Sequence, residues 1–173
     1  FNPKRLVMSK VFTFTLNGMM EMADPGIGDS DYTYNKYVGE LATFFNFEPG
    51  GVFKWRLKTG AITGDAPNFK EFQLGGVGSL RALPYKSLDG SYGYDHIGGT
   101  NHFANQMFLS NAEIQFGSPS YSSSEWIDFD DFYLSIFLDS GWANYNSDLA
   151  ESDNPFTDFL GFEFDDLHHN GGI

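Results

Sequence analysis

The amino-acid sequence predicts an all-β fold, and more specifically part of a transmembrane antiparallel β-barrel. Aromatic residues make up 18% of the chain and glycine supplies 20 of its 173 residues. That composition suits strands joined by turns and the aromatic girdles of membrane barrels. Apolar and polar side chains alternate over segments of about 11 to 14 residues, long enough for tilted membrane spans. These segments predict five strands and the start of a sixth.

The first two strands are predicted over residues 6–17 and 37–47. In each of them alternate positions are apolar, so one face carries side chains such as Phe12 and the other carries polar ones such as Glu40. A polar stretch over residues 24–36 contains proline and glycine, which indicates a long connection. Residues 48–51, Glu-Pro-Gly-Gly, predict a tight hairpin turn after the second strand.

The third strand, residues 52–63, has the most regular alternation. Its apolar side chains are Phe53, Trp55 and Leu57, and between them stand the cations Lys54, Arg56 and Lys58. In a soluble sheet the cations would form a solvated face, whereas in a barrel they would line the lumen and the apolar face would meet lipid. The cations could bind an anionic substrate. We expect them instead to neutralise Glu40, Glu113 and nearby acids within the lumen.

A long glycine-rich connection follows over residues 64–102, and connections of that length are usually functional or disordered. Two more strands are predicted over residues 103–116 and 132–143, and residues 162–173 begin another. No segment has a convincing helical period. Long and short connections alternate, as they do between the outer and periplasmic ends of outer-membrane barrels. The turn after the second strand would be periplasmic and the 64–102 loop extracellular.

Composition and motifs also exclude several kinds of site. The net charge of −13 argues against a nucleic-acid partner, and the absence of cysteine excludes disulfides and thiolate metal sites. His168 and His169 stand beside two aspartates, but adjacent strand residues point to opposite faces, so no metal site is expected. Gly76-Val77-Gly78 lacks the Lys-Ser/Thr pair of a phosphate-binding loop. No catalytic arrangement is readable, and we expect neither an enzyme nor a cofactor.

Residues 72–83, Phe-Gln-Leu-Gly-Gly-Val-Gly-Ser-Leu-Arg-Ala-Leu, resemble the loop motif of the BamA-like surface-antigen superfamily of outer-membrane insertases and translocases. The family pattern is Phe-x-Leu-Gly-Gly-x-x-Ser-Leu-Arg-Gly-Tyr, and Ala82 and Leu83 depart from its last two positions. Three other features follow the family's order, and the likeness covers about residues 37–143. They are the strand Phe53 to Gly64 with Pro67 after it, the run Asn111-Ala112-Glu113, and the acid motif Phe137-x-Asp139-x-Gly141.

The resemblance implies that the long loop folds back into the barrel lumen and that Arg81 meets inward carboxylates there. Asp139 is the first partner that it implies and Glu113 the second. Strand parity agrees, because both acids fall on the polar faces of their strands, and a buried guanidinium needs a carboxylate partner. The loop motif comprises Gly75, Gly76, Gly78, Ser79 and Leu80, and the strand motif comprises Phe137 and Gly141. The alternative interpretation leaves Arg81 exposed in the loop and Asp139 as a strand-end acid.

The resemblance further implies a fragment of a C-terminal barrel of about 16 strands, whose closing strands and periplasmic POTRA domains lie outside residues 1–173. Both ends of the chain look cut, since it opens at Phe1 rather than at methionine. The implied function is assembly and insertion of outer-membrane proteins, or polypeptide translocation, in the bacterial outer membrane. The implied partners are nascent outer-membrane or secreted polypeptides, the lipid bilayer with lipopolysaccharide, and accessory lipoproteins. Two alternatives stay open, namely a barrel that anchors a separate enzyme domain and a soluble β-sandwich binding module.

Overall fold

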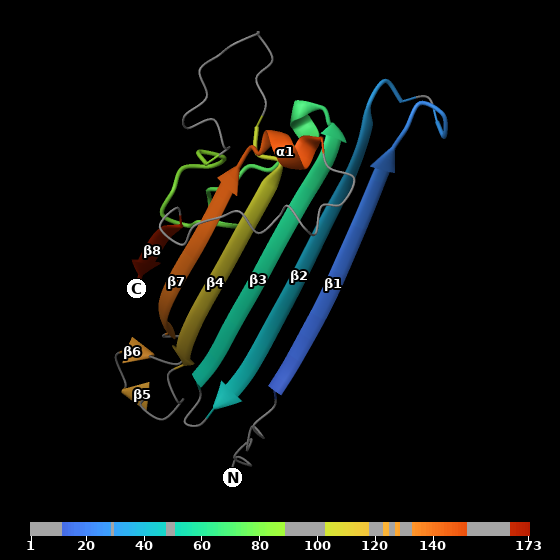
Figure 1. Cartoon of the computed structure of the whole chain (residues 1–173). Coiled ribbons are helices and arrows are strands. Elements are labelled where there is room, and N and C mark those ends of the chain that lie inside the picture. Colours follow the sequence, from blue (N-terminus) through green and yellow to red (C-terminus); the bar gives the residue numbers. More distant parts are fainter. Residues whose placement is uncertain are drawn as a thin grey trace.

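The computed structural model confirms the all-β prediction. It describes residues 12–28, 30–47, 51–88, 103–117, 123–124, 127–128, 133–151 and 167–173. These residues form long antiparallel strands with almost no helix (Figure 1). The two short helical segments are a 3₁₀ turn, η1 (Asn68–Lys70), and α1 (Ser147–Ala150).

Six strands form one antiparallel sheet in which each strand lies beside its neighbours in the chain. The strands are β1 (Phe12–Ala23), β2 (Thr33–Phe47), β3 (Gly51–Asp65), β4 (Gln106–Gly117), β7 (Tyr133–Asn144) and β8 (His168–Gly172). Their order across the sheet is β1-β2-β3-β4-β7-β8 (Figure 1). Over the described residues this sheet is open and does not close on itself. A separate ribbon pairs β5 (Ser123–Ser124) with β6 (Ile127–Asp128).

The first two strands are longer than the sequence predicts. β1 continues past residue 17 to Ala23, and β2 begins at Thr33 rather than at residue 37. Glu21 and Lys36 are direct partners in the β1–β2 register, so these polar residues belong to the strands and not to a loop. The predicted polar stretch, residues 24–36, is therefore wrong over residues 33–36, which belong to β2. Residues 6–11 and most of the predicted turn, residues 48–50, lie outside the described part of the chain.

The later elements also differ in detail from the prediction. β4 begins at Gln106 rather than at residue 103, and residues 132 and 162–166 lie outside the described residues. The acidic connection after β7 contains α1, a helix that the sequence did not predict. Its N-cap is Asn146, whose Oδ1 accepts from the backbone N–H groups of Asp148 (2.9 Å) and Leu149 (3.4 Å). Among the described residues, no helix is long and apolar enough to cross a membrane.

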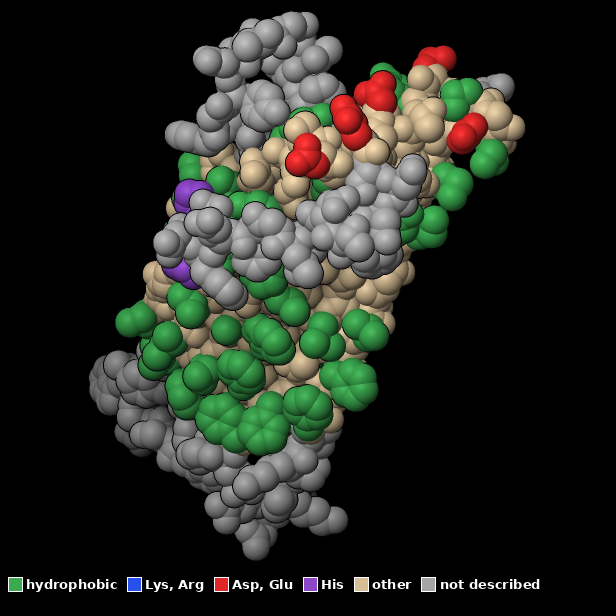
Figure 2. All heavy atoms as spheres, in the orientation of Figure 1, with side chains coloured by type: hydrophobic (Ala, Val, Ile, Leu, Met, Phe, Trp, Pro, Cys, Tyr) green, Lys and Arg blue, Asp and Glu red, His purple; other side chains and the backbone are tan. Residues whose placement is uncertain are grey.

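One side of the sheet, here called the aromatic face, carries an apolar surface across five strands. The register aligns Phe12, Phe45, Phe53, Ile114 and Ile136 in one row of this face. Figure 2 shows hydrophobic side chains over the sheet, acidic ones at its upper end, and no Lys or Arg among the coloured atoms. Many of these side chains are exposed, and they include Phe12, Phe14, Leu16, Met20, Met22, Phe116, Leu134, Ile136 and Leu138. An exposed apolar area of this extent marks an interaction surface.

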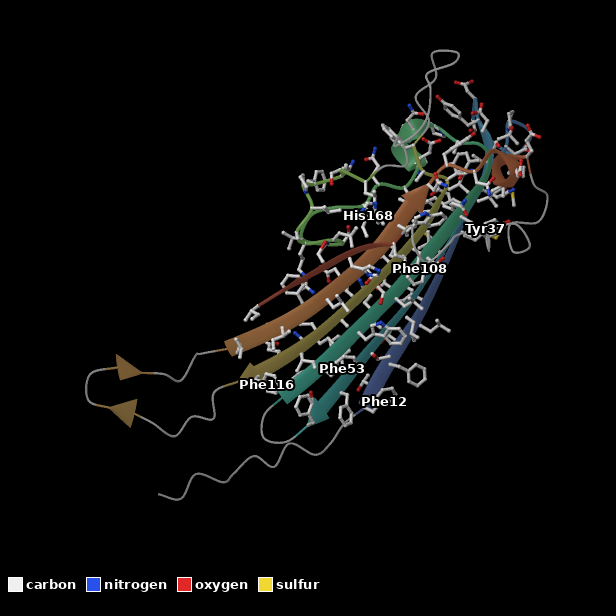
Figure 3. All side chains as sticks on the ribbon, turned by 60° about the vertical axis from the view of Figure 1, so that its left-hand side comes forward. Phe12, Tyr37, Phe53, Phe108, Phe116 and His168 are labelled. Carbon is white, nitrogen blue, oxygen red and sulfur yellow. The ribbon has the colours of Figure 1, made fainter. Side chains whose placement is uncertain are left out.

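Aromatic side chains on this face lie at two levels. Phe12, Phe53 and Phe116 lie toward the lower end of the sheet, and Tyr37 and Phe108 lie nearer the upper end (Figure 3). At the lower level the rings contact one another, as in the edge-on pair of Phe47 and Phe116 with centroids 5.9 Å apart. The row next to the lower level also carries Phe14 and Trp55, and the row after it carries Leu16, Leu41 and Leu57.

The opposite side of the sheet, here called the loop face, is covered in part by residues 66–88. In Figure 3 this connection lies to one side of the sheet, beyond β7. The buried core of the molecule lies between the connection and the upper part of the sheet, and it comprises Tyr34, Ile62, Ala66, Phe72, Leu74, Leu80, Leu88, Ala104, Met107, Leu109 and Ala143. Burial of this core therefore holds the loop against the strands.

Candidate functional site

The candidate site begins with the way in which the loop returns to the sheet. At its base, the N–H of Phe72 donates to the carbonyl of Ala104 (2.8 Å). Leu74 and Leu88 then exchange two backbone hydrogen bonds, at 2.7 and 3.0 Å. The segment between Leu74 and Leu88 thus forms a loop closed at its base by these two hydrogen bonds, and this loop carries the motif that includes Arg81.

Two glycines and one serine shape the tip of this loop. Gly75 and Gly76 have φ values of +115° and +92°, a region that favours glycine. The Ser79 hydroxyl accepts from the N–H groups of Gly75 (2.7 Å) and Leu80 (2.6 Å). The N–H of Gly76 donates to the carbonyls of Leu80 and Leu83. Leu83 packs against the core, so this departure from the family pattern is compatible with the turn.

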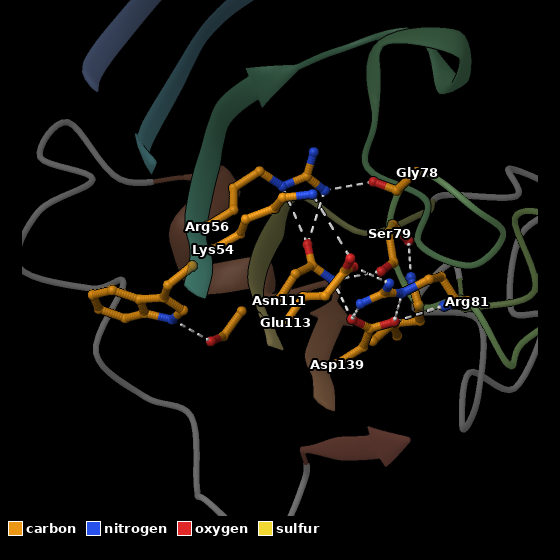
Figure 4. A network of polar contacts seen from close by, with 11 residues as sticks. Lys54, Arg56, Gly78, Ser79, Arg81, Asn111, Glu113 and Asp139 are labelled. Carbon is orange, nitrogen blue, oxygen red and sulfur yellow. Dashed lines mark hydrogen bonds and ion pairs between the residues drawn. The ribbon is translucent and has the colours of Figure 1, made fainter. Parts of the chain in front are cut away.

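Arg81 lies between carboxylates from two adjacent strands (Figure 4). Its Nε and Nη2 donate to the two oxygens of Asp139 at 2.9 and 2.8 Å, and its Nη1 donates to Glu113 Oε2 at 2.6 Å. The backbone N–H of Arg81 also donates to Asp139 Oδ2, at 3.1 Å. The Asp139 side chain is 0% exposed, so the bidentate guanidinium compensates a carboxylate that has lost its water.

The residues around the ion pair fix the position of the guanidinium. Arg81 Cζ lies 3.8 Å from the centre of the Phe137 ring, a cation–π contact. Gly141 leaves room for Leu80, because a Cβ at Gly141 would lie 3.0 Å from the Leu80 side chain. Leu80 is itself 0% exposed. Phe137 therefore contacts Arg81, and Gly141 lies against Leu80.

Asn111 connects the ion pair to the cations of β3. Its Nδ2 donates to Asp139 Oδ1 (2.9 Å) and to the Ser79 carbonyl (2.7 Å), and its Oδ1 accepts from Arg56. Arg56 also donates to the carbonyl of Gly78 (2.5 Å). This amide is positioned by register, because Asn111 and Asp139 are direct partners in the β4–β7 pair. The sequence prediction did not assign it a role in the site.

A second cluster holds the beginning of the loop to the first two strands. Lys70 Nζ donates to Glu21 Oε1 at 2.5 Å, and the Tyr34 hydroxyl donates to the same oxygen at 2.7 Å. Lys36 donates to the Lys70 carbonyl and lies over the Phe72 ring, 4.6 Å from its centre. Nothing in the sequence pattern pointed to this cluster, because its members are far apart in the chain.

Two cations in the loop have pKa values raised by their partners. The hydrogen bonds to Asp139 raise the pKa of the Arg81 guanidinium, and Glu113 adds to this effect. The hydrogen bond to Glu21 raises the pKa of the Lys70 ammonium. Because both folded-state values lie above the unfolded ones, each contribution to stability is present at neutral pH and is lost only in strongly alkaline solution.

The other predicted lumen charges are only partly brought together. Lys54 lies 3.9 Å from Glu113 and donates to Gln115. Glu40 and Lys58 are direct partners in the β2–β3 register, but within the described part of the chain neither forms an ion pair. The expected mutual neutralisation therefore holds for Lys54 and Glu113 only, and Arg56 instead binds neutral oxygens.

The two histidines lie on opposite faces of β8. His168 is paired with Gly141, and His169 is paired with Ser140, whose Oγ lies 2.8 Å from His169 Nδ1. Asp165 and Asp166 lie outside the described residues. Within the described residues no group of three or more His, Asp or Glu side chains is placed to hold a metal ion.

A scan of the chain against models of known protein families gives no match, and a search of curated proteins gives no significant one. The family resemblance of residues 72–83 therefore remains a hypothesis that rests on the motif and on the contacts of Arg81.

Proposed function

We propose that the chain is part of an outer-membrane β-barrel that inserts or translocates polypeptides, and that Arg81 latches its long loop inside the lumen. The observation that carries this proposal is the opposite character of the two faces of one sheet. The aromatic face is apolar and exposed, whereas the loop face holds the Arg81–Asp139–Glu113 network. A lipid-facing exterior and a polar, partly plugged interior are the general design of such barrels.

The spacing of the aromatic side chains supports a membrane setting for the aromatic face. Tyr37 stands ten positions from Phe47 along β2, which corresponds to about 34 Å along a strand. At a tilt of about 40° this becomes about 26 Å along the membrane normal, close to the roughly 25 Å band between aromatic girdles. The remaining strands that a closed barrel requires would lie outside the six described here.

Neighbouring tryptophans on opposite faces test the membrane setting. In full-length protein whose native tryptophans, Trp55, Trp126 and Trp142 among them, are all changed to phenylalanine, Phe45→Trp and Phe44→Trp place one indole at nearly the same depth on either face. We expect brominated lipid to quench the fluorescence of Phe45→Trp several-fold more strongly, because residue 45 lies on the aromatic face and residue 44 on the loop face. Equal quenching, or failure to associate with vesicles, would favour the soluble β-sandwich.

The latch is tested by reconstituting insertion with the full-length protein. Arg81→Ala and Asp139→Ala should each lower the yield of inserted substrate barrel per folded insertase, because the loop loses its hold on β7. Lys86→Ala is a suitable control, since Lys86 is an exposed cation of the same loop whose ammonium lies over the Tyr85 ring. If both latch variants assemble and insert substrate like the control, the proposed role of Arg81 is wrong.

A further inference from the structure

A cleft of about 460 Å³ lies on the loop face, between the docked loop and strands β1 to β4. Its volume falls within the roughly 300–1,000 Å³ of ligand pockets. We propose that this cleft is a binding site for acidic side chains of an extended polypeptide. This inference rests on the proposed function, since it assigns a substrate-contacting role to the same lumen. It centres on Lys58, which forms no ion pair with Asp139 or Glu113.

Three cations line the cleft, and they differ in how many of their N–H donors already have a partner within the protein. Lys36 donates to the Lys70 carbonyl and lies over Phe72. Arg56 uses Nε and Nη2 for Asn111 and Gly78, which leaves Nη1. Lys58 forms no ion pair with any described residue. Lys58, helped by Arg56 Nη1, is therefore the group best placed to bind an incoming anion.

Two carboxylates line the same cleft and must be taken into account. Glu71 accepts from the backbone N–H of Phe103 at 2.5 Å, so this acid is held at the base of the loop. Glu40 faces Lys58 across the β2–β3 register without an ion pair. The cations still outnumber the acids, with three against two in the lining. An anionic ligand would thus compete with Glu40 for Lys58.

The apolar part of the lining favours a carboxylate carried on a methylene stem over a bare inorganic anion. Met107 and Leu109, which are 4% and 2% exposed, lie in the wall of the cleft beside the cations. Asn17 and Gln73 add neutral polar groups at other points of the lining. Glutamate and aspartate side chains combine the charge with the apolar stem that such a wall accommodates.

The experiment measures binding of a fluorescent hexaglutamate peptide to purified full-length protein in detergent micelles, by anisotropy. We expect Lys58→Gln to weaken binding about tenfold, the effect of one charge-assisted hydrogen bond. Glu40→Gln should tighten binding a few-fold because the competing carboxylate is gone. Binding to the unchanged protein should fall as salt is raised. A hexalysine peptide should not bind at this site.

Lys86→Gln is the matched control, because it removes the same charge from an exposed loop residue that does not line the cleft. Equal weakening by Lys58→Gln and Lys86→Gln would overturn the site, since net charge alone would then explain binding. Displacement of the peptide by equimolar inorganic phosphate would overturn the polypeptide as its occupant. The assay measures binding and needs no insertion activity, so a finding that Arg81 plays no part in insertion would not decide its outcome.

Discussion

Replacing Arg81 by alanine should lower the free energy of unfolding by about 3–5 kcal/mol, the usual effect of breaking a buried ion pair. The reason is the Asp139 carboxylate, which is 0% exposed and would lose the two hydrogen bonds that the guanidinium donates. Only the backbone N–H of residue 81 would remain as a donor from the loop. The measurement is urea unfolding of the full-length protein in phospholipid vesicles, followed by tryptophan fluorescence. Lys86→Ala, in the same loop, should change stability by less than about 0.5 kcal/mol.

A double-mutant cycle separates the ion pair from general damage to the loop. Asp139→Ala alone leaves Arg81 with Glu113 as its remaining carboxylate partner. The variant that combines Arg81→Ala with Asp139→Ala should therefore be more stable than the sum of the two single effects predicts, with a coupling of about 1–3 kcal/mol. Additive effects would show that Arg81 and Asp139 do not stabilise one another. Arg81→Lys should recover only part of the loss, because lysine cannot bind both carboxylate oxygens at once.

Adding a single methyl group at Gly60 should also release the loop. A Cβ at this position would lie 2.4 Å from the Phe72 ring, which is buried and anchored by the Phe72–Ala104 hydrogen bond. The ring has to leave its place, so Gly60→Ala should cost about 1–3 kcal/mol of unfolding free energy. Limited proteolysis should then cut the 66–88 connection faster.

Gly39→Ala is the matched control for this prediction. Gly39 lies one strand away, in the row next to that of Gly60 but on the aromatic face. An added Cβ there would meet only the Thr59 side chain at 3.7 Å, an ordinary contact. In the Phe72→Ala background, Gly60→Ala should no longer destabilise, because the ring with which the added Cβ clashes is gone. The double variant should therefore regain part of the stability that Phe72→Ala alone loses. If Gly60→Ala and Gly39→Ala unfold alike, Phe72 is not what requires glycine at residue 60.

Alternation along single strands was enough to predict much of the fold. It assigned Asp139 and Glu113 to one face and Phe53 and Trp55 to the other, and the register of the sheet agrees with those assignments. The partners of Arg81 came instead from the resemblance of the loop motif, which implied contacts with both acids, and the hydrogen bonds of Arg81 agree with it. The face assignments succeed because the side chains of a strand alternate with a fixed period of two, so one polar residue determines the face of its neighbours.

The parts that sequence reasoning missed depend on contacts between distant segments. The role of Asn111 follows from its being the direct partner of Asp139, and the need for glycine at residue 60 follows from the position of Phe72. Glu21 lies outside the predicted first strand, 6–17, and the Lys70 side chain that pairs with it comes 49 residues later. Helix α1 has only four residues, too few to display a helical period.

The contacts of Arg81 also make the loop a test of correct strand alignment. The guanidinium binds acids from both β4 and β7, while Asn111 of β4 donates to Asp139, its direct partner. A slip of β7 by one residue would turn Asp139 to the aromatic face and leave Arg81 without its main partner. A slip by two would keep the face but move the carboxylate by about 7 Å. The ion pair can therefore form in only one alignment, so it stabilises the correct register of β4 and β7 over the shifted ones.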